Sequence, residues 1–337
     1  MSDKIKLGLF GVGHLGKVHL KLLKELAGER DDLEIVGIND INAENLSKIS
    51  EEFEVTGYEN RNELIEKINA GVIVTSTSAH YELAKELLSK GIHCFIEKPI
   101  TDTIEEANEL LEIFNQQKVT VQIGHIERFN PALLAIEKYN LTPLFIESHR
   151  LSQFNPRGTD VSVIKDLMIH DIDIILNLVK SKVKNISANG VAIITDKIDI
   201  ANARIEFENG CVANVTASRI SQKKMRKMRI FQQNAYISVD FAENTSEVFR
   251  LTKDAPEGSG GFAMSVGQIE KNGESLDIYY EKPKHEEINP LKFELNSFID
   301  SIKNNSEPKV TLEDGMEALR VAEMIVNQIE ETQKFKI

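Results

Sequence analysis

The stretch of the chain that most suggests chemistry is VIKDLMIHDIDIILNL, residues 163–178. It places Asp166, His170, Asp173 and Asn177 at spacings of four, three and four among apolar residues. On an ideal helix, at about 100° per residue, these four side chains fall within roughly 60° of one another. Such a stripe is typical of a metal site, of an acid–base pair, or of the wet face of a buried helix, where polar groups need partners.

The metal interpretation takes Asp166, His170 and Asp173 as three ligands. One histidine with two carboxylates and no second histidine is a poor zinc set, so no metal is predicted. Asp173 and Asn177 are expected to cap or pair at a domain junction. The acid–base interpretation keeps Asp166 and His170 and needs partners from elsewhere in the chain.

The elements that must position these residues begin with the first 125 residues, where apolar strand patterns alternate with helical patterns. Strands are expected at 5–10, 33–40, 71–78, 93–98 and 119–124, and helices at 16–26, 42–52, 80–88 and 104–114. Alternation of this kind predicts an α/β domain with a doubly wound parallel sheet.

The first strand leads into a glycine-rich turn that opens a helix. Gly11 is suited to the tight turn, Gly13 to the approach of a pyrophosphate to the backbone, and Gly16 to close helix packing, while the helix N-terminus offers N–H groups to the anion. The candidate cofactor-binding residues of the turn are Gly11, Val12, Gly13, His14, Leu15 and Gly16.

Asp40 ends the second strand pattern, 24 residues after Gly16. A carboxylate there accepts hydrogen bonds from the ribose hydroxyls of the adenosine and repels a 2′-phosphate. Because no lysine or arginine follows in INAEN, NAD is predicted in preference to NADP. The alternative is a helix cap or turn residue.

Two later strands end in VTSTSAHYE and FIEKPI. Ligands of open α/β sheets bind at the carboxyl ends of strands, so polar residues there should border the cofactor crevice. Lys98 is the most informative of them, because Pro99 stiffens its loop and restricts it to extended conformations. The alternative is a solvated surface lysine. The crevice residues are Thr75, Ser76, Thr77, His80, Glu97 and Lys98.

Three motifs in this order, EKP after one strand, GHIERFNPA after the next and DLMIHDID on a later helix, resemble the glucose–fructose oxidoreductase/inositol dehydrogenase/rhizopine catabolism (Gfo/Idh/MocA) family over nearly the whole chain. The resemblance implies a nicotinamide-dependent dehydrogenase of sugar or polyol hydroxyls. It implies that Lys98, Asp166 and His170 work beside the nicotinamide. Either Lys98 or His170 is then the base.

Within that family, the residues around these motifs look most like the branch that oxidises UDP-N-acetylglucosamine at C3. This implies that Arg128 and Asn130 face the substrate, the alternative for Arg128 being an ion pair at the domain junction. A free sugar or inositol is the alternative substrate. A non-catalytic NAD-binding sensor is the alternative of another class, although the presence of lysine, histidine and aspartate together argues against it.

From about residue 144 the pattern changes to longer strands and hairpins, one turning at Asn209-Gly210. Residues 126–337 are therefore expected to form an α+β substrate domain: a mainly antiparallel sheet with the Asp166 helix on one face, and C-terminal helices that return toward the NAD-binding domain of residues 1–125. A second copy of the sheet covering its other face predicts a homodimer or homotetramer. Residues 253–265 are expected to be a loop.

The composition of the chain argues against two classes of binding partner. With 53 acidic and 40 basic residues the net charge is −13, which argues against general nucleic-acid or anionic-membrane binding. The basic run from Arg219 to Arg229 is expected to be a solvated connection or a site for a diphosphate-bearing substrate. Two separated cysteines, no signal-peptide pattern and no apolar run of membrane-spanning length predict a cytoplasmic protein.

Overall fold

The computed structural model describes residues 4–155, 161–253, 261–271 and 273–334, and it contains two compact units. The first unit takes the residues up to Ile126 together with Asn289–Leu319. The second takes Glu127–Ile288 and the residues from Arg320 onward. None of the helices in the described ranges combines the length and apolarity that crossing a bilayer requires.

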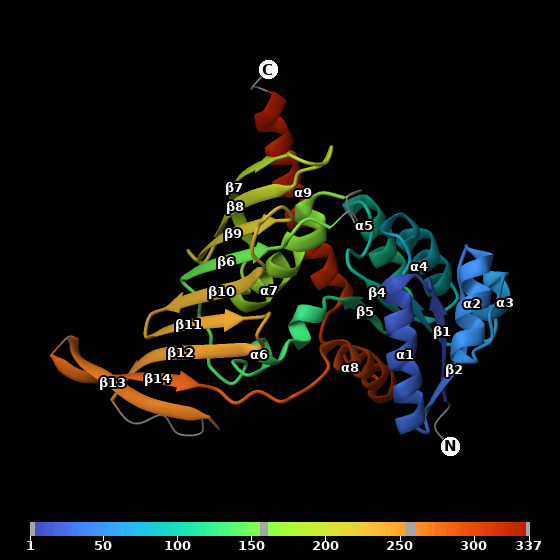
Figure 1. Cartoon of the computed structure of the whole chain (residues 1–337), viewed down its shortest axis with the longest axis horizontal. Coiled ribbons are helices and arrows are strands. Elements are labelled where there is room, and N and C mark those ends of the chain that lie inside the picture. Colours follow the sequence, from blue (N-terminus) through green and yellow to red (C-terminus); the bar gives the residue numbers. More distant parts are fainter. Residues whose placement is uncertain (1–3, 156–160, 254–260, 272, 335–337) are drawn as a thin grey trace. The chain divides into compact units, whose positions relative to one another are not determined.

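The first unit is built on a five-stranded sheet in the order β2-β1-β3-β4-β5, with every neighbouring pair parallel (Figure 1). The strands are β1(Ile5–Phe10), β2(Leu33–Asn39), β3(Ala70–Ile73), β4(His93–Glu97) and β5(Val121–Gly124). The helices are α1(His14–Glu29), α2(Ala43–Phe53), α3(Arg61–Ile65), α4(His80–Ser89), α5(Ile104–Phe114) and α8(Pro290–Asn304), with the 3₁₀ turn η1(Thr77–Ala79) before α4.

Alternate residues of β1 show that helices cover both faces of this sheet. Leu7 and Leu9 belong to a buried cluster with residues of α1 and α8. Between them, a Cβ on Gly8 would lie 3.2 Å from the Leu64 side chain of α3, so Gly8 faces the opposite layer. This arrangement is the doubly wound sheet that the sequence predicts, with α8 added from much later in the chain.

The second unit is built on a nine-stranded sheet in the order β13-β14-β12-β11-β10-β6-β9-β8-β7 (Figure 1). Only β6 and β9 pair in parallel, and all other neighbours are antiparallel. The strands are β6(Phe145–Leu151), β7(Val183–Val191), β8(Ile200–Phe207), β9(Val212–Ser218), β10(Met225–Gln232), β11(Ala235–Asp240), β12(Thr245–Thr252), β13(Phe262–Lys271) and β14(Glu274–Lys282). The predicted hairpin turn is present, with Gly210 at φ +86°.

Helices cover one face of the nine-stranded sheet. A π-helical turn, η3(Ile164–Met168), contacts β9 and runs directly into α7(Ile169–Val179), which lies on β6 and β9. The 3₁₀ turn η2(Ile126–Phe129), the short α6(Pro131–Leu134) and the last helix, α9(Leu312–Lys334), complete the elements. Alternate residues of β6 are buried under the helices and half-buried on the other face, as a one-sided layer requires.

One prediction from the sequence, the loop at residues 253–265, is wrong in part. Of the loop predicted at 253–265, residues 254–260 lie outside the described residues, whereas Phe262 to Ser265 begin strand β13. That strand pairs only with β14 and forms the edge of the sheet. Because nearly all of its residues are exposed, its sequence lacks the alternation that would mark a strand.

Candidate active site

The glycine turn after β1 has the geometry that a dinucleotide requires. Gly11 has φ +87°, and a Cβ there would lie 2.5 Å from the Val74 carbonyl oxygen. A Cβ on Gly16 would lie 2.0 Å from the Gly11 carbonyl oxygen, so only glycine lets α1 begin so close to the turn. Gly13 is exposed, and a Cβ there would meet nothing within 4 Å. The first and third glycines therefore shape the turn, and the second leaves its backbone open.

The helix that follows begins two residues earlier than predicted, at His14. His14, Leu15 and Gly16 are its first helical residues. The N-cap residue is Gly13, so the N-cap position provides no side-chain hydrogen bond to these three residues. Their N–H groups and the positive end of the helix dipole suit a pyrophosphate. Val12 serves the turn differently, because it is buried and its N–H donates to Asp40 at 2.8 Å.

Asp40 follows β2 directly and belongs to the same edge of the sheet. Its Oδ2 accepts from the Val12 N–H and its Oδ1 from the Asn42 N–H, both at 2.8 Å. Asn42, not Asp40, caps α2. Asp40 is half-exposed, and its oxygens retain lone pairs that suit a ribose diol. The residues present therefore fit a bound dinucleotide.

The two later loops at this edge are tied together by a buried histidine. Thr75, Ser76 and Thr77 follow β3 and are at least partly exposed, whereas His80 is only 1% exposed. The Nδ1 of His80 lies 2.8 Å from the Pro99 carbonyl oxygen, and its Nε2 lies 3.3 Å from that of Thr75. Burial lowers the pKa of His80, although the two carbonyl oxygens act in the opposite direction. His80 thus joins the loops that follow β3 and β4.

Glu97, the last residue of β4, is also held inside the unit. Its Oε1 lies 2.9 Å from Nε2 of His19 on α1, and its Oε2 accepts from the Lys98 N–H at 3.2 Å. His19 is fully buried and packs edge-on against Phe95. The half-buried Lys98 directly follows β4, and the contact between Glu97 and His19 holds the end of that strand against α1. Sequence reasoning missed His19, although a histidine on the apolar face of α1 was a signal.

In the second unit, Asp166 lies on the π-helical turn η3 and His170 on the first turn of α7. Both side chains are half-buried, with 32% of the Asp166 side chain exposed. Short π-helical segments occur frequently at functional sites. Asp166 lines a pocket of about 520 Å³ together with three cationic side chains, Arg219, Lys224 and Arg226. The Asp166 carboxylate lies 4.0 Å from Nη2 of Arg219.

The two aspartates of α7, Asp171 and Asp173, form buried ion pairs. Arg150 of β6 binds Asp171 through two hydrogen bonds of 2.9 and 3.0 Å, and it binds Glu127 at 2.7 Å. Arg128 binds Asp173 in the same way, through two hydrogen bonds of 2.7 and 2.8 Å. Asp173 therefore pairs, as predicted, and both of its oxygens are used. Sequence reasoning missed Arg150, because nothing local marks a strand residue that reaches a helix.

The substrate-facing prediction for Arg128 and Asn130 finds no support in this geometry. Arg128 is 3% exposed and occupied by Asp173, which favours the ion-pair alternative. Asn130 is 5% exposed; its Oδ1 accepts from the Ala132 N–H at the start of α6, and its amide donates to the Phe241 carbonyl oxygen. Both contacts stabilise the segment that leads into the second unit.

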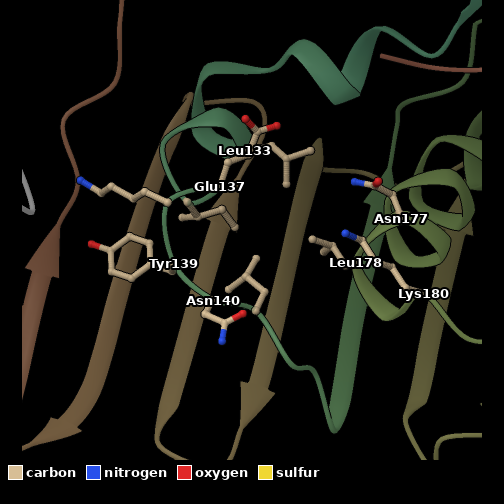
Figure 2. A pocket seen from close by; sticks show the side chains of 10 residues that line it. Leu133, Glu137, Tyr139, Asn140, Asn177, Leu178 and Lys180 are labelled. Carbon is tan, nitrogen blue, oxygen red and sulfur yellow. The ribbon is translucent and has the colours of Figure 1, made fainter. Parts of the chain in front are cut away.

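Asn177, the last polar residue of the stripe, lines a different pocket at the other end of α7 (Figure 2). This pocket has a volume of about 440 Å³, and its wall includes Leu178, Lys180 and Tyr139. Figure 2 shows the α7 residues on one side and the segment from Leu133 to Asn140 on the other. Across the described ranges, no three histidine, cysteine or carboxylate side chains are grouped to hold a metal ion.

Comparison with known proteins places this geometry in a family. Residues 5–125 match the oxidoreductase family with an NAD-binding Rossmann fold, and residues 143–238 match the Gfo/Idh/MocA C-terminal domain. A UDP-N-acetylglucosamine 3-dehydrogenase from Acidithiobacillus ferrooxidans is 37% identical over 246 residues, 73% of this chain and 77% of that protein. The chain belongs to the Gfo/Idh/MocA family. It is an oxidoreductase with an NAD-binding Rossmann domain.

The solved structure of that enzyme and one further relative extend the comparison. The solved structure of the Acidithiobacillus ferrooxidans UDP-N-acetylglucosamine 3-dehydrogenase superposes with a TM-score of 0.85 at 31% identity, covering 97% of each chain. A myo-inositol 2-dehydrogenase from Thermotoga maritima is 22% identical and covers 99% of this chain and 98% of its own length. Family members of this size thus act on both sugar nucleotides and free polyols.

Proposed function

We propose that this Gfo/Idh/MocA protein is an NAD-dependent dehydrogenase that oxidises a sugar hydroxyl to a ketone, at C3 of UDP-N-acetylglucosamine or of a related sugar nucleotide. The observation that carries the choice of substrate is the 37% identity over 246 residues to a UDP-N-acetylglucosamine 3-dehydrogenase. The inositol dehydrogenase of similar length is 22% identical. Free sugars and inositols are therefore the second choice.

The proposal assigns Lys98, His170 and Asp166 to one reaction, although they belong to different units. Bound NAD⁺ supplies the hydride acceptor. Lys98 and His170 both contact the hydroxyl; one removes its proton and the other stabilises the developing charge. Proton removal by such a base contributes about 10²- to 10⁴-fold. Asp166 sets the tautomer of His170 or holds a neighbouring hydroxyl.

Several residues are assigned to the cofactor in this proposal. Gly13, His14 and Leu15 offer backbone N–H groups to the pyrophosphate, and Asp40 binds the adenosine ribose. A 2′-phosphate would meet the Asp40 carboxylate, which supports NAD over NADP. Thr75, Ser76 and Thr77 border the cofactor directly. Glu97 and His80 act on it indirectly, because both are buried and hold the loop that carries Lys98.

We also propose that the protein is a homodimer or homotetramer assembled through the open face of the nine-stranded sheet. Six aromatic rings from neighbouring strands line up on that face, with centroids 5.0 to 6.3 Å apart. Phe231 is 37% exposed and Phe262 56%. The other four rings are half-buried, and a stripe of partly exposed aromatic side chains is typical of a protein interface. Light scattering coupled to size-exclusion chromatography gives the size of the assembly.

A cytoplasmic location completes the proposal. Cys94 and Cys211 are both buried and free of a disulfide. Burial raises the pKa of both thiols, that of Cys211 to about 11, so neither is a reactive thiolate at neutral pH. Two inert thiols in an acidic enzyme suit a reducing compartment.

The deciding experiment follows NADH at 340 nm with the purified protein, NAD⁺, and a panel of UDP-sugars, free hexoses and inositols. Turnover of UDP-N-acetylglucosamine supports the proposal, and the position of the new ketone is read by NMR of the product. Turnover of free polyols alone would replace the substrate and keep the reaction class. NAD binding without turnover of any compound would favour the sensor.

A further inference from the structure

The pocket beside Asp166 forms where three strand ends meet at one edge of the sheet. In the register, Leu151 at the end of β6 lies opposite Met225 at the start of β10 and beside Ser218 at the end of β9. The chain leaves β6 and β9 and enters β10 at this point, and the residues beyond these strand ends line the pocket, including Ser152, Gln153, Arg219 and Lys224. The basic run noted in the sequence therefore does not extend into solvent as a whole, because part of it forms one wall of a pocket.

Hydrogen bonds between the emerging segments hold this wall in place. The Ser152 N–H donates to the Ser218 carbonyl oxygen at 2.8 Å, and the Ser221 N–H donates to the Ser152 carbonyl oxygen at 2.9 Å. The side-chain amide of Gln153 donates to the Gln222 carbonyl oxygen at 3.0 Å. The pocket is thus a built feature rather than a gap between loose loops.

The lining of the pocket carries a positive charge, whereas the chain as a whole is negative. Three cationic side chains and one carboxylate, that of Asp166, line the pocket in a protein of net charge −13, and Arg226 also lies 3.8 Å from the Glu127 carboxylate. Arg219 is 4% exposed, and its Nη2 donates to the Val161 carbonyl oxygen at 2.7 Å, which fixes the guanidinium beside Asp166. Lys224 and Arg226 are exposed on the outer side. The pocket of Figure 2 has a smaller excess of positive charge, because its two lysines, Lys138 and Lys180, are accompanied by Glu137. Its other lining residues are apolar or neutral.

We propose that this pocket binds the diphosphate of the sugar nucleotide, an inference that rests on the proposed function. Lys224 and Arg226 bind the phosphate oxygens, since guanidinium and ammonium groups are the usual phosphate ligands. Arg219 lies 4.0 Å from the Asp166 carboxylate, so a sugar whose diphosphate is bound in this pocket is held close to that carboxylate. Phe154, 43% exposed on the pocket wall, stacks on the nucleobase. A free inositol carries no charge for this cluster to bind.

The test uses the full-length enzyme and single substitutions of exposed residues. Lys224→Ala and Arg226→Ala should each raise the KM for UDP-N-acetylglucosamine and weaken inhibition by UDP by about 10- to 100-fold, the loss expected for one charged hydrogen bond. Their kcat and their KM for NAD⁺ should stay near the wild-type values. Lys223→Ala is the matched control: it removes a neighbouring exposed lysine that does not line the pocket and should change neither constant.

A second probe separates the parts of the ligand. Inhibition by inorganic pyrophosphate should weaken in Arg226→Ala and stay unchanged in Phe154→Ala, whereas inhibition by UDP should weaken in both. If Lys224→Ala and Arg226→Ala bind UDP as the wild type does while turnover of UDP-N-acetylglucosamine persists, the pocket assignment is wrong and the proposed function stands. If the wild type oxidises free polyols and UDP does not inhibit it, the proposed function fails first.

Discussion

Replacing Arg128 with methionine tests whether the buried pair with Asp173 is structural or serves the substrate. The substitution removes two charge-assisted hydrogen bonds of 2.7 and 2.8 Å and leaves a carboxylate whose side chain is 1% exposed. Breaking a buried pair in this way costs about 3–5 kcal/mol. For a unit of this size each kcal/mol lowers the Tm by about 2–4 °C, so the second unit should melt about 6–20 °C lower.

The assay is thermal unfolding followed by circular dichroism, together with the KM for substrate at a temperature where the variant is folded. Adding Asp173→Leu to Arg128→Met should restore much of the lost Tm, because no charge is then left buried. Arg204→Met is the control, since its pair with Glu206 is 46% and 38% exposed and contributes about 0–1 kcal/mol. An unchanged Tm with a raised KM would refute the structural assignment and return Arg128 to the substrate.

Three further outcomes follow from the site and the fold. Lys98→Met and His170→Ala should each lower kcat by about 10²-fold or more while the Kd for NAD⁺, measured by fluorescence quenching, stays near the wild-type value. Asp40→Ala should lower the ratio of kcat/KM for NAD⁺ to that for NADP⁺, because the repulsion of the 2′-phosphate is removed. Burial opposes ionisation of Asp199, but backbone N–H groups led by that of Thr195 lower its pKa to about 2. The stability that Asp199 contributes is therefore complete above about pH 4 and is lost as the pH falls toward 2; the acid unfolding curve of Asp199→Asn, followed by circular dichroism, should lack that component.

The dinucleotide side of the site could be predicted because its signals are local. Gly11, Gly16 and Asp40 lie within 30 residues and around one turn, and their roles follow from backbone geometry that the chain itself dictates. Lys98 was found for the same reason, since it stands at a strand end before a proline. In the structure Gly11, Asp40 and Lys98 directly follow strands β1, β2 and β4, and Gly16 lies in the first turn of α1.

The buried ion pairs of the second unit depend on contacts between distant segments of the chain. The resemblance implied that Arg128 faces the substrate, with an ion pair as the alternative, and no residue near Arg128 in the sequence indicates Asp173, 45 residues later. Arg150 and Asp171 escaped notice because a strand arginine and a helix aspartate meet only once the helix has packed on the sheet. The fold class is thus encoded in periodicity, whereas the partners of buried charges are encoded in topology.

The direction of the Asp166 side chain depends on the π-helical turn η3, whereas the register of α7 on the sheet is fixed by other contacts. Arg150 and Arg128 fix α7 at Asp171 and Asp173, so a residue gained or lost between these aspartates and the rest of α7 would turn the carboxylates away from their partners. The same change within η3 would rotate Asp166 by about 100° and leave these two ion pairs intact. Under the proposed function, a change in this one turn alters the direction of the Asp166 carboxylate toward the substrate while α7 keeps its place on the sheet.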